Sequence, residues 1–247
     1  MVIEFIWLAI AFPLIGVILN GLLGRRLGRG FVSIVGSGVV ALAFLVGLFS
    51  ALDLLAFPPH DRQVVVTLWN WITIGTFRVG ISLLADPLSI LMVLIVTGVG
   101  FLIHVYSIGY MEHESDRMYA RFFTFMNLFI VSMLILVLAA NYLLMYVGWE
   151  LVGLCSYLLI GFWFFKRDEL QDPIQLKNGD EVAVPANLNP PDAGKKAFIV
   201  NRVGDVGFAL GVFLIWITFG TLNFAGVFSA APSVATATIT AITLLLF

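Results

Sequence analysis

Long apolar stretches separated by short polar segments dominate the pattern of this 247-residue chain. The stretches last about 20 residues and lack the two-residue alternation of barrel strands, so each can cross a bilayer as a helix. The pattern predicts six transmembrane helices and the start of a seventh: 3–23, 31–55, 86–107, 122–140, 141–165 and 197–217, with the last beginning near residue 234. The predicted fold class is all-α integral membrane, a polytopic helix bundle.

Two of the connecting segments have patterns of their own. Residues 63–83 are rich in β-branched side chains and end in an alternation of apolar and polar positions, which predicts an outer-face β-hairpin between helices two and three. Residues 166–194 are polar and contain four prolines, which predicts an irregular cytoplasmic loop.

Composition narrows the class further. Hydrophobic residues make up 61% of the chain and charged residues 11%, which excludes a soluble protein built around one core. A net charge of −2 without a basic tail gives no support to nucleic-acid binding. The single cysteine, Cys155, is predicted to be a small buried side chain, because it can form neither an intrachain disulfide nor a cysteine-rich metal site. The motifs for nucleotide hydrolysis, dinucleotide binding and zinc hydrolysis are absent from the sequence.

Basic residues predict the orientation. Of the 13 lysines and arginines, all but Arg62 and Arg78 follow the first, third or fifth helix. Because cytoplasmic loops carry the excess of lysine and arginine, the N-terminus is predicted to face outward, in the inner membrane of a bacterium.

Glu150 is the most informative ionisable residue, because it lies within an otherwise uncharged predicted helix. A carboxylate at this depth costs about 2.5–3.5 kcal/mol on insertion scales, so it must be paired, protonated or part of an ion path. On a helical wheel Glu150 shares a face with Tyr146, Gly153 and Tyr157, which predicts that it points into the bundle. The interpretation left open beside proton exchange is a static pair that ties two helices together.

Three more ionisable residues lie within predicted helices. Arg202 and Asp205 are three positions apart, so they are neighbours on one helix surface and can pair. Asp205 lies about 15 Å along that helix from Lys195 and therefore needs a partner, whereas Arg202 can extend toward the interface. His104 is either a hydrogen-bonded residue near a helix end or a proton relay.

Several stretches carry a resemblance to a known family: TGVGFLIHVYSIGYM, GWELVGLCSYLLIGFWF, KKAFIVNRVGDVGFALGVFLI and GTLNF. They resemble the antiporter-like subunit L of respiratory NADH:quinone oxidoreductase (complex I), chain 5 in mitochondria. The resemblance implies a proton-translocating membrane-arm subunit whose partners are other membrane-arm subunits, the lipid bilayer and protons. It also implies that this chain holds no cofactor, because NADH, FMN, the iron–sulfur clusters and quinone belong to other subunits.

The resemblance also assigns roles. Glu150 would be the functional mid-membrane glutamate of the first half-channel, Arg202 and Asp205 in NRVGD would be the charged pair of the sixth helix, and His104 falls in the GFLIH segment. It divides the chain into residues 1–85, with two helices and the hairpin, and residues 86–247, the beginning of the antiporter-like repeat.

The sequence departs from the family in two respects. The segment 166–194 is longer than expected, and no lysine follows Lys196, whereas family members pair the glutamate with a lysine on the seventh helix. The chain is expected to be a truncated product or a fragment that stops within that helix. Two alternatives therefore stay open: the large subunit of a multi-subunit Na⁺/H⁺ antiporter, and a non-pumping remnant or assembly scaffold.

Overall fold

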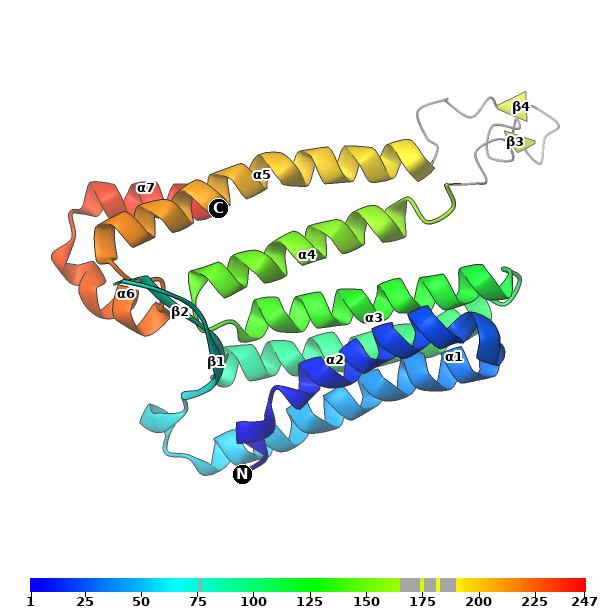
Figure 1. Ribbon diagram of the computed structural model, residues 1–247, viewed down its shortest axis with the longest axis horizontal. Coiled ribbons are helices and arrows are strands. Elements are labelled where there is room, and N and C mark those ends of the chain that lie inside the picture. The colour runs from blue at the N-terminus through cyan, green and yellow to red at the C-terminus, as the bar shows by residue number, and fades with distance from the viewer. Residues whose placement is uncertain (76, 165–173, 176–180, 183–189) are drawn as a thin grey trace.

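Long helices lying side by side form most of the computed structural model, which describes residues 1–75, 77–164, 174–175, 181–182 and 190–247 (Figure 1). The α-helices are α1 (Leu8–Ala56), α2 (Pro87–Tyr110), α3 (Asp116–Leu138), α4 (Tyr142–Ile160), α5 (Pro190–Phe219), α6 (Phe224–Ala230) and α7 (Thr236–Leu246). Short 3-10 helices cover Val2–Phe5, Pro59–Asp61 and Ala231–Ser233, and the strands are β1 (Val64–Ile74), β2 (Phe77–Ala85), β3 (Ile174–Gln175) and β4 (Glu181–Val182).

The first long helix is a hairpin. At Gly28 the backbone takes φ 82° and ψ 175°, a region open essentially to glycine alone, and the chain reverses there. The two arms then run antiparallel: the Ile3 amide donates a hydrogen bond to the Asp53 carboxylate (3.0 Å), and Gly16 lies against Val39. Both predicted helices are present. The segment between them, predicted as a polar connection, is helical in α1 except at Gly28.

The membrane fold follows from these lengths. Among the described residues, five helical segments are long and apolar enough to cross a bilayer, and the first of them, Val2–Ala56, contains the α1 hairpin. Since that segment reverses, the described chain contains six crossings. The all-α membrane class is confirmed, and α7 begins close to the predicted start near residue 234.

The β-hairpin is also confirmed. Strands β1 and β2 pair antiparallel from Val64 opposite Ala85 to Ile74 opposite Phe77. The hairpin lies at the end of the bundle where α3 meets α4 and α5 meets α6 (Figure 1). It is joined to the bundle there, because Asn141 donates its side-chain amide to the Gly80 carbonyl (3.0 Å). The side of the membrane on which this end lies stays a prediction.

Tight local packing fixes the position of α4 between α3 and α5. The Asn141 side chain accepts a hydrogen bond from the Leu144 amide (2.9 Å) and so caps the start of α4, only three residues after α3 ends. Further along, a Cβ on Gly148 would lie 2.6 Å from the Leu136 backbone nitrogen, so only glycine allows this approach to α3. At the far end of α4, a Cβ on Gly194 of α5 would lie 3.2 Å from the Gly161 Cα, so α4 and α5 also approach closely there.

The predicted loop 166–194 is wrong at its C-terminal end. α5 begins at Pro190, so residues 190–194 are helical, because proline is well suited to the first helical position, where no amide partner is lost. The two-residue strands β3 and β4 pair antiparallel within the same segment. The remainder of that prediction lies outside the described residues.

Candidate functional site

Two neighbouring helices bring Glu150, Arg202 and Asp205 together. Glu150 lies near the middle of α4, and the Tyr146 hydroxyl, one turn earlier, donates a hydrogen bond to its Oε1 (2.6 Å). From α5, Nη1 of Arg202 lies 2.9 Å from Oε1 and 2.8 Å from Oε2 of the same carboxylate. The Glu150 carboxylate therefore accepts hydrogen bonds from a phenol and from a guanidinium. Both are charge-assisted, which makes them stronger than hydrogen bonds between neutral groups.

Asp205 is the more deeply buried acid of the cluster. Its side chain is 6% exposed, and the Trp149 indole donates a hydrogen bond to its Oδ1 (2.7 Å). Nη1 of Arg202 lies 3.6 Å from its Oδ2. One guanidinium nitrogen thus faces two carboxylates and lies closer to that of Glu150.

Aromatic rings hold the donors in place. The Phe208 ring stacks on Tyr146 (centroids 5.5 Å apart) and on Trp149 (5.6 Å), the residues that donate to the two acids. The Arg202 guanidinium lies 4.8 Å from the centroid of the Phe198 ring, a cation–π contact. The rotamers of the tyrosine and the tryptophan are therefore fixed by packing as well as by hydrogen bonds.

The cluster has one open flank. The side chain of Arg202 is 48% exposed and that of Glu150 23% exposed, although both lie in the central part of long apolar helices. Charged groups at this depth normally face protein or a water-filled cavity. This flank of α4 and α5 is therefore a surface that needs a polar or protein cover.

His104 lies elsewhere in the bundle. It is fully buried on α2, its Nδ1 lies 2.7 Å from the Gly100 carbonyl oxygen, and its ring contacts Phe123 of α3. Among the residues that the structure describes, its Nε2 forms no hydrogen bond, and the same holds for both side-chain polar atoms of Asn20 and Asn127. The helix continues for six residues beyond it, so the expectation that His104 lies near a helix end is wrong. Its role as a relay stays a prediction.

Two further expectations can be placed. Cys155 is fully buried as a free thiol, with its Sγ 3.6 Å from the Ser132 hydroxyl. Tyr157, expected on the same helix face as Glu150, packs its ring against Phe198 of α5 (5.7 Å), the helix that also carries Arg202. In the part of the chain that the structure describes, no group of three His, Cys, Asp or Glu side chains is close enough to hold a metal.

Sequence reasoning did not identify Trp149 or Phe208 as parts of the site. Trp149 precedes Glu150, so a wheel centred on the glutamate places it about 100° away and apparently off the face. That rotation aims the indole at α5, where Asp205 needs a donor. The sequence did contain a signal for this contact. Trp149 carries an indole N–H donor next to Glu150, and Asp205 on the neighbouring helix needed a hydrogen-bond donor.

Comparison with known proteins places this chain in a class. Residues 71–123 match the family described as NADH-Ubiquinone oxidoreductase (complex I), chain 5 N-terminus, and residues 139–174 match NADH:quinone oxidoreductase/Mrp antiporter, TM.

Two solved structures share the fold. A chain of the membrane-bound sulfane sulfur reductase, an archaeal respiratory membrane complex, has a TM-score of 0.75 at 18% identity, with 98% of this chain and 43% of that chain covered. A chain of the Mrp complex from a Dietzia species has a TM-score of 0.70 at 23% identity, with 98% and 23% covered. The class is that of antiporter-like membrane subunits.

Curated relatives identify the branch of that class. NADH-quinone oxidoreductase subunit L of Mycobacterium tuberculosis is 43% identical over 98% of this chain and 35% of its own length. The Escherichia coli protein of the same name is 45% identical over 92% of this chain and 33% of its own. The chain is a homologue of NADH-quinone oxidoreductase subunit L, as the resemblance predicts, and it spans about a third of the length of these relatives.

Proposed function

We propose that this chain is part of a proton-translocating membrane-arm subunit of NADH:quinone oxidoreductase, with Glu150 as the proton carrier. The observation that carries the proposal is the pair at the middle of the membrane helices, where Arg202 contacts both oxygens of the Glu150 carboxylate at 2.8 and 2.9 Å. Homology to subunit L supplies the class of reaction.

The mechanism uses the position of one cation between two acids. A unit charge 4 Å from a carboxylate contributes about 4 kcal/mol at an effective dielectric constant of 20, so a small displacement of Arg202 changes how firmly Glu150 holds a proton. Asp205 provides the second position for the guanidinium, since its carboxylate is already 3.6 Å away and is anchored by Trp149. In this proposal the Glu150 carboxylate pairs with Arg202 while the guanidinium faces it and accepts a proton when the guanidinium moves toward Asp205. Tyr146 keeps one oxygen of Glu150 oriented throughout.

The remaining parts of the proposal concern the surroundings. The open flank beside Arg202 would be covered by other membrane segments of the complex, because a half-exposed guanidinium at this depth needs polar neighbours. NADH, FMN, iron–sulfur clusters and quinone would be bound by other subunits. The N-terminus would face outward, and residues 1–85 and 86–247 would form the two parts of the chain.

A second candidate function is that of the large subunit of a multi-subunit Na⁺/H⁺ antiporter. The likeness to the Mrp complex fold is consistent with it, whereas the subunit L relatives support the first function. Cation exchange without NADH oxidation in the purified assembly would distinguish this function from the first. A non-pumping scaffold would assemble with its partners and leave proton movement unchanged when Glu150 is altered.

The test is proton translocation by the assembled complex carrying Glu150→Gln, which keeps the size of the side chain and removes its proton exchange. We expect NADH oxidation to lose most of its coupling to proton movement through this subunit. The matched control is Glu112→Gln, since Glu112 is an exposed residue outside α2 and α3. Normal pumping by the assembled Glu150→Gln complex would refute the proposal.

A further inference from the structure

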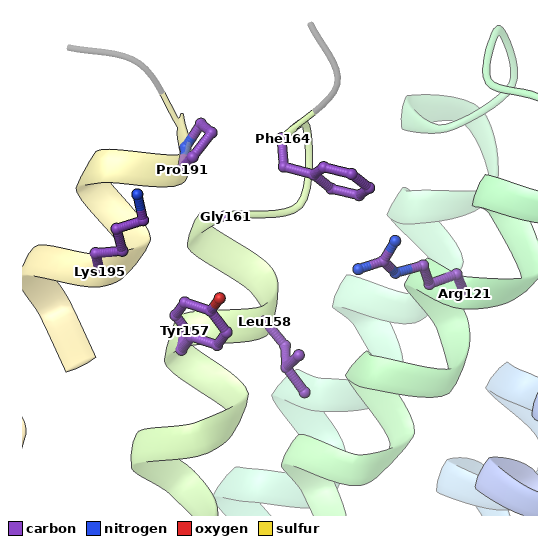
Figure 2. Close-up of a pocket in the computed structure, with 7 residues that line it drawn as sticks. All are labelled: Arg121, Tyr157, Leu158, Gly161, Phe164, Pro191 and Lys195. Atoms are coloured by element: carbon purple, nitrogen blue, oxygen red, sulfur yellow. The ribbon is translucent and has the colours of Figure 1, made fainter. Parts of the chain in front are cut away.

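A pocket of about 260 Å³ lies at the end of α4, between α3 and α5 (Figure 2). It is distant along α4 from the acid cluster, because Tyr157 is seven residues, or about 10 Å, beyond Glu150. Residues from all three helices line it: Arg121, Tyr157, Leu158, Gly161, Phe164, Pro191 and Lys195.

Two cations border the pocket from opposite sides. Arg121 of α3 extends toward Phe164, and Lys195 of α5 lies on the side of Pro191 (Figure 2). Arg121 is held in place by rings, with its guanidinium carbon 5.1 Å from the centroid of Phe125 and 5.0 Å from that of Phe164. Within the described residues no carboxylate lies at ion-pair distance from Arg121.

The other charges near the pocket oppose a bound anion only weakly. Lys195 contacts Asp192 at 3.4 Å, but both side chains are well exposed, and such pairs contribute little. The last carbonyls of α4 carry partial negative charge here, whereas α3 and α5 both begin at this end and present positive helix termini. The first turns of α3 and α5 also carry Asp116 and Asp192, so the attraction of the pocket for an anion comes mainly from Arg121 and Lys195.

The level of the pocket selects the kind of anion. It lies where the apolar helix Tyr142–Ile160 ends, and the end of a helix long enough to cross a bilayer is expected at the depth of lipid headgroups. Its walls are amphipathic, with the rings of Tyr157 and Phe164 and the side chain of Leu158 beside the two cations. A phosphate flanked by acyl chains matches this arrangement of charge and apolar surface better than a freely soluble ion does.

We propose that this pocket binds the phosphate headgroup of an anionic glycerophospholipid. The Arg121 guanidinium donates to the phosphate from α3, Lys195 closes the opposite side from α5, and the Tyr157 hydroxyl is a third donor. The acyl chains lie along Leu158 and the outer surface of α4. The bound lipid would brace α3, α4 and α5 at the end away from the β-hairpin. The inference does not depend on proton transfer by Glu150.

The experiment measures lipid retention by native mass spectrometry. The full-length protein, in its complex and stripped of endogenous lipid in detergent, is titrated with dioleoyl phosphatidylglycerol, with dioleoyl phosphatidylcholine and with inorganic phosphate as a competitor. Arg121→Gln and Lys195→Gln are compared with the matched controls Arg117→Gln and Lys196→Gln, which remove neighbouring exposed charges that do not line the pocket. Thermal unfolding of each variant establishes that it is folded.

Each pocket substitution should weaken phosphatidylglycerol binding about fivefold and the double variant about thirtyfold, because one basic residue near anionic lipid is worth about 1 kcal/mol. The two controls should bind as the parent does, phosphatidylcholine should bind more weakly, and inorganic phosphate should not compete. Equal loss in the controls would mean a diffuse charge effect, and full competition by phosphate would mean a site for free anions. Either result, or pocket variants that bind as tightly as the parent, would overturn the proposal.

Discussion

The hydrogen bond from Trp149 to Asp205 gives the sharpest quantitative test of the acid cluster. Trp149→Phe removes the indole donor, which lies 2.7 Å from Oδ1 of Asp205, and leaves a ring that can still stack on Phe208. Among the described residues, Arg202, at 3.6 Å, would be the remaining partner of Asp205.

The expected cost follows from the burial of the acceptor. A hydrogen bond to a charged group contributes about 1.5–3 kcal/mol, and Asp205, at 6% exposed, has little solvent to replace the lost donor. We expect the stability to fall by about 2 kcal/mol, which lowers the thermal unfolding midpoint by about 4–8 °C for a chain of this size.

A double-mutant cycle isolates the contact. The unfolding midpoints of the purified protein in detergent are measured for Trp149→Phe, for Asp205→Leu and for the double variant. Trp71→Phe on β1, an exposed indole, is the control and should change the midpoint little. The effects of the two substitutions should not add, because each removes the same hydrogen bond. Full additivity would mean that the indole and the carboxylate do not interact, and the geometry of the site would be wrong.

Three further substitutions test the fold around the site. Gly28→Ala should destabilise the α1 hairpin by about 1–3 kcal/mol in a thermal unfolding assay, because alanine disfavours a φ of 82°. The control is Gly30→Ala, which should be neutral or slightly stabilising, because Gly30 is helical and has open space around it. Arg29→Gln should lower stability by about 1 kcal/mol or less, since its pair with Asp116 (2.6 Å) is exposed. Arg29 also donates to the carbonyls of Glu112 and Glu114 in the α2–α3 turn, and a larger loss by chemical denaturation would show that these two contacts dominate. Gly148→Ala should cost about 1–3 kcal/mol by forcing α4 away from the α3 backbone, and an unchanged melting curve would contradict the close approach.

Much of the fold could be predicted from the sequence because a membrane enforces simple rules. Apolar length fixes a helix crossing, and the alternation before Pro87 fixes the β-hairpin. The reversal at Gly28 was less accessible, because three arginines nearby suggested a polar loop where the structure has two helices meeting at one residue. The helical start of α5 was missed because proline disfavours a helix interior and yet is well placed at its first position.

The site was predictable in part. A costly charge in an apolar helix pointed to Glu150, and the wheel placed Tyr146 beside it, where it does donate to the carboxylate. The spacing of Arg202 and Asp205 suggested that they pair with each other, but the guanidinium lies closer to Glu150, because α5 lies beside α4 at this level. Such a preference depends on the relative height of two helices, which no pattern within one helix encodes.

The central claim is that Glu150 and Arg202 act as one unit in moving protons. It is tested most directly by proton translocation in the assembled complex carrying Glu150→Gln, Arg202→Gln or both, with NADH oxidation measured in parallel. The account predicts that each single substitution uncouples proton movement and that the double variant is no worse than the more severe single one, because both remove the same unit. Wild-type translocation in the assembled Arg202→Gln complex, or losses that multiply in the double variant, would contradict it.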